Sequence, residues 1–290
     1  MPEGPIAFIG AGNMASSLIG GLRQKGWPAP IYAVEPDDAR RAAVTANHGV
    51  EAMPTPDDRV GGAELIVLAV KPGVVAQALA ELQPVLADPP APILSVAAGV
   101  RAADVRRWSG RPTPVVRAMP NTPALLLAGA SALWAEPSVT TEQRIRAAQV
   151  LEAVGLAVWV ANEAQLDAVT ALSGSGPAYF FALIEAMEAA AVDLGLDAAV
   201  ARQLACQTAY GAATMVTQSP ETPTRLRERV TSPGGTTAAA LEVLSTRGLA
   251  AMIADAMGAA RARAEAISNE VAAAVLPAAS ADDEQGDPSR

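Results

Sequence analysis

The fold is decided by the stretch Ile6-Ala7-Phe8-Ile9-Gly10-Ala11-Gly12-Asn13-Met14-Ala15. Its apolar residues predict a buried strand, its glycines a tight turn, and the residues after them a helix. Gly10 permits the turn, and Gly12 lets the backbone approach a pyrophosphate resting on the helix N-terminus. Ala15 replaces the third glycine of G-x-G-x-x-G and still allows close helix–strand packing. The stretch predicts a dinucleotide site that includes Ile9, Gly10, Ala11, Gly12, Asn13 and Met14.

The same alternation continues outward through residues 5–160. Apolar runs predict strands at Ile6–Ile9, Ile31–Val34, Leu65–Val70, Ile93–Val96, Pro114–Arg117, Ala130–Trp134 and Ala157–Val160. Ala-rich stretches between them predict helices at Ala15–Gln24, Asp38–Asn47, Val74–Leu86 and Thr141–Val154. Strands alternating with helices are typical of a doubly wound, mostly parallel sheet. We expect an α/β Rossmann domain over residues 1–161.

The strand signal disappears from about residue 163. Consecutive helices are predicted at Glu163–Leu172, Pro177–Leu194, Asp197–Gln218, Pro220–Val230, Gly234–Thr246 and Leu249–Val275. Several are apolar around most of their circumference, which indicates burial on more than one side. We expect an all-α dimerisation domain over residues 162–276, covered on one face by a second subunit, with burial against the first domain as the alternative. Residues 277–290 are acidic and predicted to be disordered.

The amino-acid composition excludes several classes of function. The chain has 290 residues, with 21 Lys+Arg against 30 Asp+Glu, so its net charge of −9 is wrong for a nucleic-acid or anionic-membrane surface. One cysteine and one histidine exclude a disulfide framework and a multi-Cys/His zinc site. The sequence has neither an apolar run of membrane-spanning length nor a secretory leader pattern. We expect a cytoplasmic protein that acts on a small molecule.

The end of the second predicted strand, Ala33-Val34-Glu35-Pro36-Asp37, bears on the choice between NADH and NADPH. An acid here accepts hydrogen bonds from the ribose hydroxyls and repels a 2′-phosphate, so Glu35 favours NADH. Arg40 and Arg41 follow closely and offer charge for the phosphate of NADPH. A solvated helix face explains these arginines equally well, and both coenzymes stay open.

Other loops at strand ends carry candidate contacts. Lys71 is one of two lysines and alone follows an apolar strand, so coenzyme contacts are expected at Ala69, Val70, Lys71 and Pro72. Small residues after another strand, Ala97 and Ala98, let a nicotinamide or its ribose lie close to the backbone. In the second half, Gly234-Gly235 leads into a helix whose free amides would hold a small carboxylate.

Five segments in this order and spacing closely resemble the pyrroline-5-carboxylate reductase family over residues 5–270: Gly10–Ala15, Ala69–Pro72, Arg117–Ala124, Leu172–Tyr179 and Val230–Leu241. The resemblance implies NAD(P)H-dependent reduction of the C=N bond of 1-pyrroline-5-carboxylate to L-proline. It implies a homodimer with interlocked helical domains, commonly assembled further into a decamer. The imine site would lie between the nicotinamide and a Gly234–Thr237 loop contributed by the partner subunit.

The resemblance also implies roles for single residues. Thr237 would be the catalytic residue and would hydrogen-bond near the imine nitrogen, while Gly235, Thr236 and Glu163 would join it in binding substrate. Many members carry a hydroxyl or small residue at position 35, so Glu35 is a departure. A β-hydroxyacid dehydrogenase is the nearest rival, but its second-domain lysine has no counterpart because no lysine follows Lys71. A non-catalytic nucleotide-binding regulator would leave the second-domain loop unexplained.

Overall fold

The computed structural model describes residues 4–274. These form two compact units, one of residues up to Gly174 and from Ala260 onward, the other Ser175–Ala259. Residues 162–174 thus group with the first unit, whereas the sequence pattern places its domain boundary at 161/162. That boundary stays a prediction, and the expected disordered tail, 277–290, lies outside the described residues.

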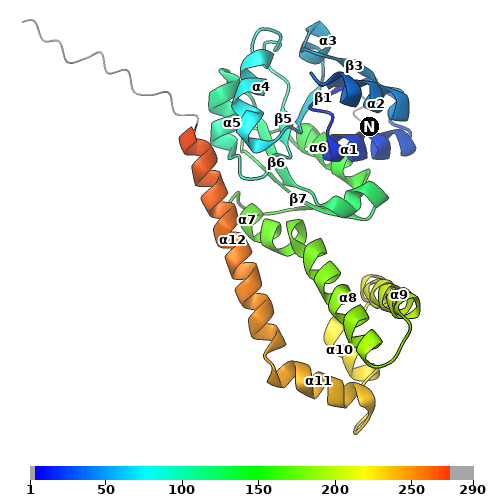
Figure 1. Cartoon of the computed structure of the whole chain (residues 1–290). Helices are drawn as coiled ribbons and strands as arrows, with labels where there is room; N and C mark the ends of the chain where they lie inside the picture. Colours follow the sequence, from blue (N-terminus) through cyan, green and yellow to red (C-terminus); the bar gives the residue numbers. More distant parts are fainter. Residues whose placement is uncertain (1–3, 275–290) are drawn as a thin grey trace, which may run out of the picture. The chain divides into compact units, whose positions relative to one another are not determined.

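The first unit is built on an eight-stranded sheet with the order β3-β2-β1-β4-β5-β6-β7-β8 (Figure 1). Its strands are β1 (Ile6–Ile9), β2 (Ile31–Val34), β3 (Glu51–Met53), β4 (Leu65–Leu68), β5 (Ile93–Ser95), β6 (Val115–Met119), β7 (Gly129–Ala135) and β8 (Gly155–Trp159). All pairs are parallel except β6 with β7. The predicted doubly wound, mostly parallel sheet is confirmed.

Helices cover both faces of this sheet. The helices are α1 (Asn13–Gln24), α2 (Asp38–His48), α3 (Asp58–Gly61), α4 (Val75–Leu82), α5 (Ala102–Ser109), α6 (Thr141–Glu152) and α7 (Gln165–Val169). One apolar core joins Leu18 of α1 and Val150 of α6 to strand residues such as Phe8. A second core joins Leu79 of α4 and Val105 of α5 to the sheet. The strands therefore carry apolar residues toward both faces, as a buried parallel sheet requires.

Three of these strands and helices were not predicted: β3, α3 and α5. β3 has only three residues, Glu51–Met53, and no apolar alternation. α5 begins after Arg101, whose side chain makes no cap hydrogen bond. Its first amide, that of Ala102, instead donates to Glu163 Oε1 at 2.8 Å, so a residue 61 positions away supplies the cap.

The second unit contains α8 (Gly176–Asp193), α9 (Ala198–Gln218), α10 (Pro223–Arg229), α11 (Thr236–Thr246) and the first part of α12 (Leu249–Ala274). Large apolar side chains are exposed on it: Phe180, Phe181, Leu204 and Tyr210 are 55–68% accessible in the single chain. An exposed surface of this kind marks an interaction site. Among the described residues, no single helix is long and apolar enough to cross a membrane, although the bent pair Thr236–Thr246 and Leu249–Ala273 passes that test jointly.

Candidate active site

The glycine turn after β1 leaves the start of α1 open to an anion. Gly10 has φ +93°, and a Cβ there would lie 2.9 Å from Val70 Cγ1. Gly12 is the N-cap of α1 and offers no side-chain cap. A Cβ on Gly12 would meet no described atom within 4 Å, so the space beside its backbone is open. Uncapped amides beside open space are what a pyrophosphate needs.

Glu35 closes this turn from the end of β2. Its side chain is buried, and Oε2 accepts the Ala11 amide at 2.9 Å. Oε1 accepts the Asp37 amide at 3.2 Å. These bonds fix the carboxylate against the loop that would hold the pyrophosphate, where a dinucleotide fold places its adenine ribose.

The nearby arginines are arranged differently from each other. Arg41 Nη1 donates to the carbonyl oxygens of Glu35, at 2.8 Å, and Pro36, at 3.2 Å, while Nη2 pairs with Asp38. The Arg40 side chain is exposed, and its backbone amide donates to the Asp37 carboxylate. The charge of Arg41 is thus already partnered by Asp38.

The loops after β4 and β5 meet the same edge of the sheet. β4 lies beside β1, and the Ala69 amide donates to the Ile9 carbonyl at 2.9 Å. Lys71 precedes the short 3-10 helix Pro72–Val74 (η1) and is exposed. β5 lies beside β4, and Ala97 and Ala98 follow two and three residues after its end. The structure therefore brings together the carboxyl ends of β1, β2, β4 and β5, the place where open α/β sheets bind ligands.

The loop that carries Ala97 and Ala98 is held at its far end. Arg101 Nη2 donates to Asn269 Oδ1 at 2.6 Å, and a Cβ on Gly99 would lie 2.8 Å from Ile267 Cγ2. Both partners belong to the last turns of α12, within the first unit. α12 thus fixes the start of α5 from more than 160 residues away in the sequence.

Glu163, a predicted substrate ligand, is half-buried and takes part in an ion pair. Its Oε1 accepts Arg117 Nη1 at 2.9 Å in addition to the Ala102 amide. Arg117 lies on β6 and is only 7% exposed. Burial raises the pKa of the nearby Asp167 carboxyl, and Arg117 opposes that rise. The described contacts use Oε1, so a substrate role for Glu163 would fall to its second oxygen.

Two polar residues have structural contacts that the sequence reasoning missed. Asn121 accepts the Ala130 amide at 2.8 Å and donates to the Ser173 carbonyl at 2.9 Å, which joins two segments of the first unit. The single histidine, His48, lies in a segment whose sequence resembles a surface turn. In the structure it is half-buried, with Nε2 2.7 Å from Ser16 Oγ. Burial and Arg23 lower its pKa.

In the second unit, the predicted substrate loop is a tight turn before α11. Gly234 has φ +70°, and the Gly235 amide donates to the Ser232 carbonyl at 3.0 Å. A Cβ on Gly235 would lie 2.4 Å from Ser232 Oγ, so any other residue here requires that hydroxyl to move. Gly235 caps α11 without a side chain, and Thr236 and Thr237 begin the helix. The first amides of α11 and the Thr237 hydroxyl therefore stand in the same turn.

Comparisons with known proteins agree with this arrangement. A family model described as pyrroline-5-carboxylate reductase dimerisation matches residues 163–267, and one described as NADP oxidoreductase, coenzyme F420-dependent, matches residues 5–99. A pyrroline-5-carboxylate reductase of Pseudomonas aeruginosa is 47% identical, covering 92% of this chain and 97% of the relative. One of Glycine max is 38% identical, covering 91% of this chain and 96% of the relative.

Solved structures give the same result. A pyrroline-5-carboxylate reductase from Coxiella burnetii superposes with a TM-score of 0.87 at 37% identity, covering 92% of this chain and 99% of that one. The enzyme from Plasmodium falciparum, solved with NADP bound, superposes with a TM-score of 0.79 at 25% identity, covering 92% and 99% of the two chains. The chain belongs to the pyrroline-5-carboxylate reductase family.

Proposed function

We propose that this protein is a pyrroline-5-carboxylate reductase that converts 1-pyrroline-5-carboxylate to L-proline with NADPH or NADH. The observation that carries the proposal is the pairing of two uncapped helix starts in one chain. One follows Gly12 and suits a pyrophosphate, and the other follows Gly235 and suits a small carboxylate. A reductase of this class must hold both anions.

The coenzyme is held, in this proposal, by the loops at the carboxyl ends of four strands. The α1 amides after Gly12 bind the pyrophosphate, and Glu35 meets the adenine ribose. Lys71 and its neighbours in Ala69–Pro72 line the same crevice, with Ala97 and Ala98 beside the nicotinamide. When bound, the nicotinamide supplies the hydride. The chain orients that ring for hydride transfer and excludes unproductive orientations.

The substrate is held by the turn before α11. The amides at the start of α11, on Thr236 and its neighbours, bind the carboxylate, and the Thr237 hydroxyl hydrogen-bonds near the ring nitrogen. Glu163 assists on the substrate side. A cyclic imine that enters already protonated needs no strong protein acid, so a hydroxyl and water suffice to steady the nitrogen proton.

The working unit is an obligate homodimer. The exposed apolar residues of α8 and α9 support this, because a single second unit leaves them uncovered. We further propose that each site is completed by the partner's Thr237, that dimers assemble into a decamer, and that the enzyme acts in the cytoplasm. Sedimentation at micromolar concentration tests the dimer, and a stable, active monomer would contradict it.

The function is tested by following NADH and NADPH oxidation with and without the imine. Stereospecific detection of L-proline then identifies the product. We expect imine-dependent oxidation with stoichiometric L-proline formation. A β-hydroxyacid dehydrogenase would instead oxidise hydroxyacids, and a non-catalytic nucleotide-binding protein would bind coenzyme without turnover, so either result would replace the proposal.

A further inference from the structure

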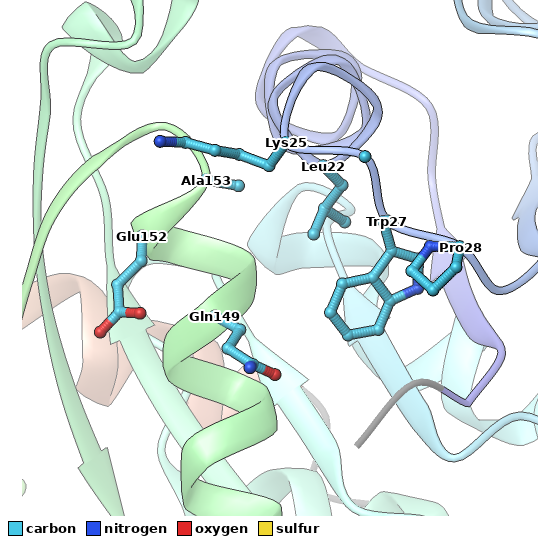
Figure 2. A pocket seen from close by; sticks show the side chains of 8 residues that line it. Leu22, Lys25, Trp27, Pro28, Gln149, Glu152 and Ala153 are labelled. Carbon is cyan, nitrogen blue, oxygen red and sulfur yellow. The ribbon is translucent and has the colours of Figure 1, made fainter. Parts of the chain in front are cut away.

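A cavity of about 400 Å³ opens in the first unit, away from the coenzyme loops. Its walls come from the end of α1, the connection through Trp27 and Pro28, and the last turn of α6 (Figure 2). The glycine turn lies at the other end of α1. Because a helix rises 1.5 Å per residue, roughly 15 Å separates Gly12 from Leu22, which lines the cavity. The cavity is distinct from the coenzyme site.

Two opposite charges stand at this cavity without partners. Lys25 and Glu152 line it, both are exposed, and within the described residues neither side chain makes an ion pair or hydrogen bond. Figure 2 shows both side chains projecting toward the same side of the cavity. A ligand that carries both charges would satisfy both residues.

Glu152 occupies an unfavourable position for an acid. It is the final residue of α6, a helix with no basic residue in its last turn. The C-terminus of a helix carries partial negative charge, which disfavours a carboxylate and favours a cation. α1 also ends at this cavity, with Lys25 as its C-cap. Two helix C-termini and one carboxylate therefore converge where an ammonium group would be stabilised.

The wall of the cavity away from these two charges combines an aromatic surface with an unused acceptor (Figure 2). The Trp27 ring faces Gln149 across the cavity (Figure 2). Gln149 Oε1 is buried and has no hydrogen-bond partner within the described part of the chain. Rotation about the Cγ–Cδ bond of this side chain is soft, so the oxygen can turn to an N–H donor in the cavity. Leu22 and Pro28 complete an apolar floor.

We propose that this cavity binds a small zwitterionic amino acid with an apolar side chain. The ammonium group lies between Glu152 and Gln149 Oε1, the carboxylate faces Lys25, and the side chain packs on Trp27. Cavities of this size with a few convergent polar groups are typical of small-ligand sites.

L-valine is the probe, because it is neither substrate nor product of the proposed reaction. Full-length protein labelled with 5-fluorotryptophan gives one ¹⁹F signal for each of four tryptophans, and loss of a signal in Trp27→Phe assigns that of Trp27. We expect L-valine to shift the Trp27 signal saturably. Isobutylamine and isovalerate, which each keep one of its charges, should bind at least about tenfold more weakly, because each leaves one partner unused.

Exposed residues make the variants safe for folding. Glu152→Gln and Lys25→Met should each weaken L-valine binding about tenfold. Glu142→Gln changes an exposed acid on the first turn of the same helix and should bind like the wild type. The proposal is overturned if L-valine leaves the Trp27 signal in place, if isobutylamine binds as well as L-valine, or if Glu152→Gln binds as well as the wild type.

Discussion

Glu35 is expected to set the coenzyme preference toward NADH. Its carboxylate is buried and fixed by the Ala11 and Asp37 amides, so it cannot swing away from a 2′-phosphate without losing both bonds. Two unit charges about 4 Å apart interact by about 4 kcal/mol at an effective dielectric constant of about 20. Arg41 offers little relief, because it is paired with Asp38 and bonded to two carbonyl groups.

The perturbation that removes the charge is Glu35→Gln, which keeps the shape and an acceptor for the Ala11 amide but loses the longer bond from the Asp37 amide. Allowing for solvent and salt, we expect at least about 1.4 kcal/mol of relief, a tenfold or greater rise in the NADPH/NADH ratio of kcat/KM. Glu35→Ser should raise the ratio similarly but weaken both coenzymes, since the bond to Ala11 is lost as well.

The assay measures kcat/KM for both coenzymes on each protein at a fixed imine concentration, together with Kd for NAD⁺ and NADP⁺. Glu51→Gln is the control for net charge. Glu51 is exposed at the start of β3 and lies opposite Tyr32 in the strand register, and Tyr32 precedes Glu35 by three residues. Its ratio should stay that of the wild type. If Glu35→Gln changes the ratio by less than about twofold, the carboxylate does not face the ribose and the reasoning is wrong.

Three further predictions follow from other contacts. Thr237→Ala should lower kcat/KM for the imine about ten- to hundredfold while leaving the Kd for NADH unchanged, and full activity in this variant would remove Thr237 from the site. Glu163→Ala leaves the buried guanidinium of Arg117 without its ion-pair partner and should lower the free energy of unfolding by about 2–3 kcal/mol. Glu163→Gln should lower it by less than about 1.5 kcal/mol. Denaturant titration measures both losses, and equal losses would contradict a role for the ion pair. For His48, burial lowers the folded-state pKa below 6.5, so the unfolded state takes up its proton first as the pH drops. The free energy of unfolding should therefore fall as the pH drops from about 7.5 to 5.5. His48→Gln should show a smaller fall, and a pH profile identical to that of the wild type would refute this role of His48.

The parts of the fold that the sequence predicts are those with a local signal. The strand before Gly10 and the helix after it follow from apolar runs and a glycine turn, and both have the expected positions. The helix expected at Glu163–Leu172 is instead α7 followed by a π-helical turn, Thr170–Gly174. Ser173 lies in that turn, and its carbonyl accepts the Asn121 side chain. No local sequence pattern predicts such a contact.

The same distinction holds at the candidate site. Glycines, strand ends and Glu35 can be chosen from sequence because each stands in a recognisable position along a βαβ unit. The coupling of Glu163 to Arg117 and to the start of α5 cannot, since it depends on which residues distant in sequence the fold brings together. The placement of coenzyme and substrate ligands remains a prediction.

The last turns of α12 belong to the first unit, and this has a consequence for biosynthesis of the protein. Chains are made from the N-terminus at about 5–20 residues per second, and domains tend to fold as they emerge. Here the loop that ends at Arg101 waits for Asn269 and Ile267, and Asn269 is made 168 residues after Arg101. While the ribosome is still adding α8 to α11, the sheet can form and Glu163 can cap α5, but the far end of this loop lacks its contacts with α12. A nascent chain is therefore expected to acquire a finished coenzyme crevice only after α12 has been made.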